Sequence, residues 1–392
     1  MLVAIALVTI NLRMTITAVG PVLEQIGADE GISPAMLGLL GALPLIFWGL
    51  ISPISHWLSS RLGMSAAISW ALVVFAIGTL WRSLPGSPIN LWIGTVLIGC
   101  GLAITNVLVP AVIKRDFPAR VPLIMGLYTA LLGGMGALGA GIAVPLSELV
   151  LIDNEPAGWR FALIMMGLPL PAALIFWVLA NRKKVRVSAL QRVHTPQGSA
   201  GKRVWGDSLA WQVSLYMGAQ SAIFYTMASW FVPYQIANGV SATSAGAELM
   251  TFQMIGIAGS LLLPLVARGG RLRRWLPAIL PAVGFSAWIG MPLVPQVMPL
   301  WLVVGGAVAG AQLTISLTLM AMRARTAEHA TALSGMAQAI GYTLAAFGPL
   351  LFGVLLGSTG SWLWPFALIW VAAAAQLLLG ISVGRPRFIL ER

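Results

Sequence analysis

One charged residue stands in the middle of a long apolar run, and its position makes it the strongest candidate for chemistry. Arg13 lies in the run 1–26, with Thr9 and Thr17 four residues to either side, so all three share one helical face. A charge at the centre of a membrane helix costs about 2.5–3.5 kcal/mol even on lenient scales, and such residues usually face a cavity. An arginine that bonds helix carbonyls or an acidic neighbour for structural reasons is the open alternative.

The acidic residues of the chain stand away from the middle of its apolar runs. Glu24 is eleven residues from Arg13, about 16 Å along a helix, and Glu248 lies near the outer end of its run. A cation in the middle of a predicted span, with no Asp or Glu in the middle of any span, suits an anionic or strongly dipolar substrate. We therefore weigh a functional role for Arg13 ahead of a structural one.

Uncharged polar residues recur at intervals of four in two further runs. The run 208–237 carries Gln212, Tyr216 and Gln220 beside a second row of Ser221, Tyr225 and Ser229, and the run 331–357 carries Ser334, Gln338 and Tyr342. Any one of them could be a hydrogen bond between helices. Their amide and aromatic groups also suit a small planar ligand. The candidate substrate-binding residues are Arg13, Thr17, Asn106, Tyr128, Gln220, Tyr225, Trp230, Gln253, Gln338 and Tyr342.

The sequence context of the possible enzyme motifs argues against an enzymatic function. The match to G-x-G-x-x-G at 134–139 lies inside an apolar run with no preceding strand, so the dinucleotide-binding interpretation fails. The three histidines, His56, His194 and His329, have no metal-ligand companion at useful spacing. We expect no catalytic residues, no cofactor and no metal site.

The elements that carry these residues are membrane helices. Of the 392 residues 58% are apolar and 9% charged, against about 25% charged in soluble proteins, and this excludes a cytosolic enzyme, a disordered chain and a nucleic-acid binder. Each run is long enough to span a bilayer. The first lacks a basic start and contains Arg13, which argues against a signal peptide. The twelve predicted spans are 1–26, 34–59, 65–83, 88–113, 121–147, 158–180, 208–237, 246–267, 275–294, 299–322, 331–357 and 362–383.

The distribution of basic residues predicts the orientation. With both termini in the cytoplasm, all but three of the 23 Lys and Arg fall on that side, the exceptions being Arg13, Arg82 and Arg160. The polar, basic stretch 181–207 predicts a cytoplasmic linker between six-helix halves at 1–180 and 208–392. The halves echo each other weakly, since runs five and eleven each contain glycines thirteen residues apart. A chain that begins inside an apolar run also predicts a short N-terminal extension.

With these features in place, the chain resembles the cyanate and nitroimidazole permease branch of the major facilitator superfamily. The likeness rests on Leu12–Thr17, Trp81–Pro85, Asn106–Pro118, Ser208–Gly218 and Ala332–Pro349, and it covers nearly the whole chain. It implies an all-α integral membrane protein with twelve helices in two pseudo-symmetric halves, alternating access, and a small polar or anionic substrate at the midplane.

Two departures from the wider superfamily stand out. The loop after the second span keeps an R-x-G core at 61–63, but Ser60 replaces the usual Asp. The fifth span lacks the Gly-Pro core of many drug/proton antiporters, which weakens an antiporter interpretation.

The sequence predicts a secondary transporter of the bacterial inner membrane that moves a cyanate-like anion or a nitroimidazole-like heterocycle. We expect a monomer in the lipid bilayer that binds a small molecule and no nucleic acid, with a coupled proton left open. Two alternatives remain: an exporter of larger apolar drugs, and a membrane-embedded enzyme or sensor.

Overall fold

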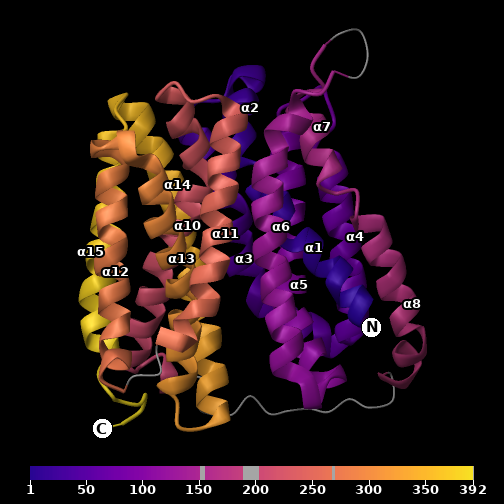
Figure 1. Cartoon of the computed structure of the whole chain (residues 1–392). Coiled ribbons are helices and arrows are strands. Elements are labelled where there is room, and N and C mark those ends of the chain that lie inside the picture. The colour runs from indigo at the N-terminus through magenta and orange to yellow at the C-terminus, as the bar shows by residue number, and fades with distance from the viewer. Residues whose placement is uncertain (151–154, 189–202, 267–269, 392) are drawn as a thin grey trace. The chain divides into compact units, whose positions relative to one another are not determined.

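The computed structural model describes residues 1–150, 155–188, 203–266 and 270–391, and these residues form mainly α-helices (Figure 1). The α-helices of the described residues are α1 (Leu2–Thr17), α2 (Leu23–Glu30), α3 (Pro34–Leu62), α4 (Met64–Arg82), α5 (Ile89–Asp116), α6 (Val121–Ser147), α7 (Gly158–Met165), α8 (Leu170–Ser188), α10 (Ser208–Ala237), α11 (Ala242–Val266), α12 (Gly270–Leu293), α13 (Met298–Met322), α14 (Ala327–Thr359) and α15 (Leu363–Val383). This arrangement confirms the predicted all-α membrane fold.

The helices match the predicted spans closely. Within the described residues, 11 helical segments are long and apolar enough to cross a membrane. The remaining predicted span is α10, whose 30 residues begin and end where the sequence predicted. Its polar residues lower its hydropathy, but its length is sufficient for a bilayer core about 30 Å thick.

The first predicted span, 1–26, is not one continuous helix. It divides into α1, a 3-10 turn at Gly20–Val22, and α2, which continues to Glu30. Pro21 has no backbone N–H, and the N–H of Val19 donates to the carbonyl of Ile16 rather than four residues back. The uniform apolar pattern concealed this interruption.

The sixth predicted span, 158–180, is also divided. The helix stops after Met165 and resumes at Leu170, with Gly167 and Pro169 in the break. The second piece, α8, continues to Ser188, so the first residues of the predicted linker 181–207 are helical. The rest of that linker up to residue 202 lies outside the described residues.

The chain forms two compact units, each described here by itself. The first unit comprises Met1–Ser33, Leu43–His194 and Ser229–Met250, and the second comprises Pro34–Ala42, Thr195–Ala228 and Thr251–Arg392. Two short segments thus cluster differently from the predicted halves, whose division remains a prediction.

Close helix packing holds each unit together. In the first unit α1 packs on α6 and α4 on α5, and in the second α12 packs on α13 and α15 (Figure 1). A Cβ added at Gly139 would lie 2.7 Å from the carbonyl oxygen of Met14, so this glycine permits the contact between α6 and α1. Gly256 and Gly310 bring α11 and α13 together in the same way. Lipid provides no hydrophobic drive for helix association, so such close approaches stabilise the bundle.

Candidate substrate-binding site

Arg13 is the polar residue of α1 that remains accessible. The side chains of Thr9, Asn11, Thr15 and Thr17 are all buried, whereas Arg13 is only partly buried. The helix therefore directs its neutral polar groups into the protein and leaves Arg13 partly exposed.

Thr17, predicted to share the ligand-binding face of Arg13, has protein partners. Its hydroxyl donates to the carbonyl of Gly136 in α6 at 2.7 Å, and it lies 3.0 Å from the carbonyl of Arg13. Thr9 donates to the carbonyl of Ile5 at 2.7 Å. The bond to Gly136 holds α1 against α6, so Thr17 helps to fix the position of Arg13.

Two other predicted residues of the first unit are brought together. The hydroxyl of Tyr128 in α6 donates to Oδ1 of Asn106 in α5 at 3.2 Å, and Nδ2 of Asn106 donates to the carbonyl of Leu102 at 3.0 Å. The second bond fixes the amide orientation, so that the asparagine presents its oxygen to the tyrosine. Trp230, also predicted, is buried and belongs to this unit.

The other predicted residues lie in the second unit. Nε2 of Gln338 donates to the hydroxyl of Ser334 one turn earlier in α14 at 3.0 Å, and Tyr342 follows one turn later, partly buried. Gln220 accepts from the hydroxyl of Ser221 at 3.3 Å. Gln338 and Gln220 are therefore held by neighbours on their own helices.

Two more predicted side chains of this unit are buried. The ring of Tyr225 meets Phe224 edge to face, with centroids 5.2 Å apart. Gln253 in α11 is buried, and its Nε2 has no hydrogen-bond partner among the described residues. Gln253 therefore keeps a free donor, while Tyr225 has an aromatic contact beside it.

One polar row of α10 points to a neighbouring helix of its own unit. Oε1 of Gln212 accepts from the hydroxyl of Ser382 in α15 at 2.6 Å. The hydroxyl of Tyr216 lies against the amide of Gln376 in α15, without closing a hydrogen bond of ordinary geometry. The sequence could not distinguish this row from one that faces a ligand.

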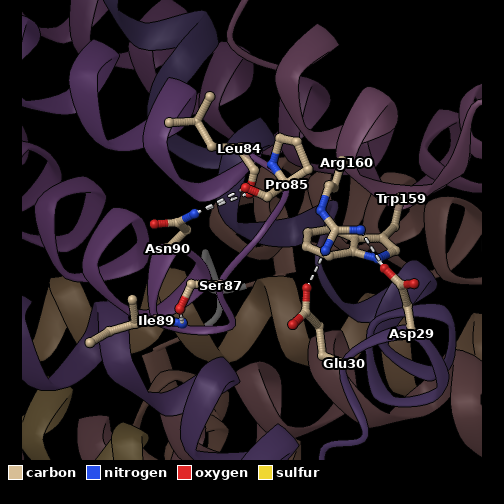
Figure 2. Close-up of polar contacts among 9 residues, drawn as sticks. All are labelled: Asp29, Glu30, Leu84, Pro85, Ser87, Ile89, Asn90, Trp159 and Arg160. Atoms are coloured by element: carbon tan, nitrogen blue, oxygen red, sulfur yellow. Dashed lines mark hydrogen bonds and ion pairs between the residues drawn. The ribbon is translucent and has the colours of Figure 1, made fainter.

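Arg160, an exception to the charge asymmetry, has a structural role. Figure 2 shows its guanidinium between Asp29 and Glu30 at the end of α2, with ion pairs to both. It also lies 4.3 Å from the ring centroid of Trp159, whose Nε1 donates to Asp29 at 2.9 Å. This cluster joins the end of the first span to the start of the sixth.

Arg82, the other exception outside α1, was assigned no role from the sequence. The structure buries it almost completely at the end of α4, where Nη1 donates to the carbonyl of Thr15 at 3.3 Å. An available signal was a basic residue ending the run 65–83 with no acidic neighbour in sequence.

The long apolar helices define a polytopic membrane protein, with a partly exposed cation in the first of them. Residues 5–346 match the Major Facilitator Superfamily, and the chain belongs to that family of transporters. Its relatives are transporters rather than enzymes, which sets the membrane-enzyme alternative aside.

Three curated relatives align with nearly the whole chain. The 2-nitroimidazole transporter of Escherichia coli is 33% identical over 99% of this chain and 96% of the relative. The cyanate transport protein CynX of the same organism is 30% identical over 99% and 98%. The uncharacterized transporter YycB of Bacillus subtilis is 32% identical over 100% and 95%. The resemblance predicted from the sequence is thereby confirmed.

Solved structures share the fold at low sequence identity. A bacterial homologue of the human lysosomal transporter Spinster, in an inward-facing conformation, superposes with a TM-score of 0.77 at 19% identity, covering 98% of this chain and 93% of that one. The D-xylose–proton symporter gives 0.77 at 14% identity, covering 98% and 97%.

Proposed function

We propose that this transporter moves a small anionic or strongly dipolar solute, of the cyanate or nitroimidazole type, by alternating access. The observation that carries the proposal is the accessible Arg13 in an α1 whose other polar side chains are buried. The names of two full-length relatives, a 2-nitroimidazole transporter and a cyanate transport protein, support this substrate class.

Arg13 attracts the solute and binds it through its guanidinium. A planar fork of N–H donors can hold two acceptor atoms of a cyanate-like anion or of a nitro group at once. Asn106 and Tyr128 line the same binding region, with Tyr128 fixed by its bond to Asn106. Gln220, Tyr225, Trp230, Gln253, Gln338 and Tyr342 orient the ligand by hydrogen bonding and stacking.

Flux through the purified protein tests the proposal. The protein is reconstituted in liposomes, and entry of labelled cyanate and of 2-nitroimidazole is measured for the native chain and for Arg13→Ala. We expect saturable entry of at least one of them that depends on Arg13. Transport of bulky apolar compounds at a rate independent of Arg13 would instead support a drug exporter.

The orientation that accompanies this function has both termini in the cytoplasm and the chain in the bacterial inner membrane. In a Cys100→Ser background, a cysteine at Ser358 should react with a membrane-impermeant maleimide added outside intact cells. A cysteine at Gly206 should not react. Both positions are exposed. The reverse labelling would overturn the orientation inferred from the basic residues.

The protein is expected to be a monomer. The mass of the detergent-solubilised protein tests this expectation.

Proton movement, if coupled, accompanies a weakly acidic substrate or uses the peripheral carboxylates of Glu24 or Glu248. Glu248 accepts a hydrogen bond from Gln235 in the same unit, and Glu24 is exposed at the start of α2. Transport is compared with and without a pH gradient. A strong gradient dependence for a permanently neutral substrate, retained by the Glu24→Gln and Glu248→Gln double variant, would refute this route.

A further inference from the structure

Arg82 is a buried guanidinium with an unfilled edge. The residue is 2% exposed, and its Nη1 donates a hydrogen bond to the carbonyl oxygen of Thr15. Its other two nitrogens, Nε and Nη2, have no hydrogen-bond partner among the residues that the structure describes. Buried donors of a charged group are costly when unsatisfied, so this arrangement needs an explanation.

Other arginines of the chain fill the edge that Arg82 leaves open. Nε and Nη2 of Arg115 donate to the two carboxylate oxygens of Asp116 at 2.8 and 3.2 Å. The same two nitrogens of the buried Arg323 donate to the carbonyl of Val383 at 2.9 and 2.7 Å. The Nε–Nη2 edge presents two parallel N–H groups and therefore matches an anion with two acceptor positions or a single compact anion.

The interruption of the first span fixes Arg82 in this position. Because the N–H of Val19 donates to Ile16, the carbonyl of Thr15 loses its usual helical donor, and Nη1 of Arg82 replaces it. On the far side, Gly94 in α5 lies so close to the backbone of Arg82 that a Cβ at that position would clash with it. The backbone of Arg82 is thus packed against α5, and its guanidinium is bonded to α1.

We propose that the free edge of Arg82 binds a small monovalent anion, such as chloride or a carboxylate of the size of formate, within the first unit. The anion supplies the acceptors and the counter-charge that the described residues do not provide to this edge. Since the side chain is enclosed, the ligand must be small enough to be enclosed with it.

This site is distinct from the proposed substrate site. Thr15 is two residues beyond Arg13, about 200° around the helix, so Arg82 approaches α1 from a different side. The same chemistry fits a resident ion and a transported anion. The experiment separates these sources.

The test measures thermal unfolding of the detergent-solubilised full-length transporter in chloride, formate or gluconate at equal ionic strength. Gluconate is too large for an enclosed site and serves as the reference anion. The variants are Arg82→Gln, Arg82→Lys and Arg13→Gln. The matched control is Arg160→Gln, which removes an outer-end arginine whose guanidinium already has two carboxylates.

We expect chloride or formate to raise the midpoint of the native protein relative to gluconate, saturably and by mass action. Arg160→Gln and Arg13→Gln should keep the increment, Arg82→Gln should lose it, and Arg82→Lys should need at least tenfold more anion because an ammonium lacks the fork. Loss of the increment in Arg13→Gln as well would identify the anion as the transported solute.

Two results would overturn the proposal. One is a native midpoint equal in all three salts, which needs no variant to fold. The other is a rise in the unfolding midpoint that persists unchanged in Arg82→Gln. The anion would then bind elsewhere, and water would be the partner of the guanidinium of Arg82. Neither result bears on cyanate or nitroimidazole flux, so failure here is separate from failure of the proposed function.

Discussion

The two compact units both bury neutral amides, but they differ in how their arginines are placed and bonded. The first encloses the guanidinium of Arg82 and keeps that of Arg13 partly accessible. The interior of the second contains neutral amides, and its buried Arg323 stands at the end of α13 with both nitrogens of one edge bonded to a carbonyl. The buried amides of the second unit are Gln220, Gln253, Gln312 and Gln376.

This difference suggests a division of labour in substrate recognition. A cation in a low-dielectric environment selects strongly for the sign of a ligand's charge. Neutral amides and tyrosines contribute direction but little charge selectivity, since each neutral hydrogen bond contributes only about 0.5–1.5 kcal/mol net. We therefore expect variants in the first unit to affect transport more than variants in the second.

The largest effect should come from Arg13. Arg13→Ala and Arg13→Lys should reach the membrane at near-normal levels and lose most uptake, at least tenfold, because hydrogen bonds to a charged group contribute about 1.5–3 kcal/mol. Lys should fail because an ammonium cannot reproduce a bidentate contact. Uptake in liposomes and the ligand-induced thermal shift are the measurements. Wild-type transport by Arg13→Ala would make this charge structural and refute the role of Arg13 in binding the substrate.

A smaller effect is expected at the Asn106–Tyr128 pair. Tyr128→Phe removes the donor of a 3.2 Å bond and should weaken ligand binding about two- to tenfold, as expected for one neutral hydrogen bond. Tyr216→Phe is the matched control, since the hydroxyl of Tyr216 closes no bond of ordinary geometry. Equal affinities for the two variants, measured by titration of the thermal shift, would remove Tyr128 from the site.

Gln338 in the second unit should matter less again. Gln338→Ala should raise the half-saturating substrate concentration about threefold, because a neutral amide donor is lost while α14 keeps its backbone bonds. Thr343→Ala, an exposed hydroxyl on the same helix that bonds the carbonyl of Ala339, is the control. A loss as large as that of Arg13→Ala would contradict the proposed division of labour.

The smallest effect is expected at Gln376. Gln376→Leu should leave uptake unchanged and the unfolding midpoint equal or higher, because both polar atoms of the amide are buried without a well-formed bond. Replacement of such a group by an apolar one of similar shape is near neutral or stabilising. Loss of transport in a well-folded Gln376→Leu protein would show that the buried amide of α15 takes part in function.

The sequence alone determined the fold class and most helix boundaries. A chain with 9% charge must place its apolar runs in lipid, and backbone hydrogen bonding in lipid then favours helices. The predicted boundaries of α6 and α10 agree with the structure at both ends. Arg13 could be selected as the leading candidate because its charge conflicts with its apolar surroundings, and such a conflict is visible without coordinates.

Tertiary structure decided what each polar group contacts. Gln212, like Gln338, belongs to a polar row with a four-residue spacing, yet Gln212 bonds Ser382 on another helix and Gln338 bonds Ser334 on its own. Arg82 and Arg160 are both outer-end arginines in the sequence, but Arg160 has two carboxylates and the Nε–Nη2 edge of Arg82 has none in the described structure. Spacing along a helix fixes the face on which a residue lies, whereas helix packing decides whether its partner is one turn away, as for Gln338, or in a distant segment, as for Gln212.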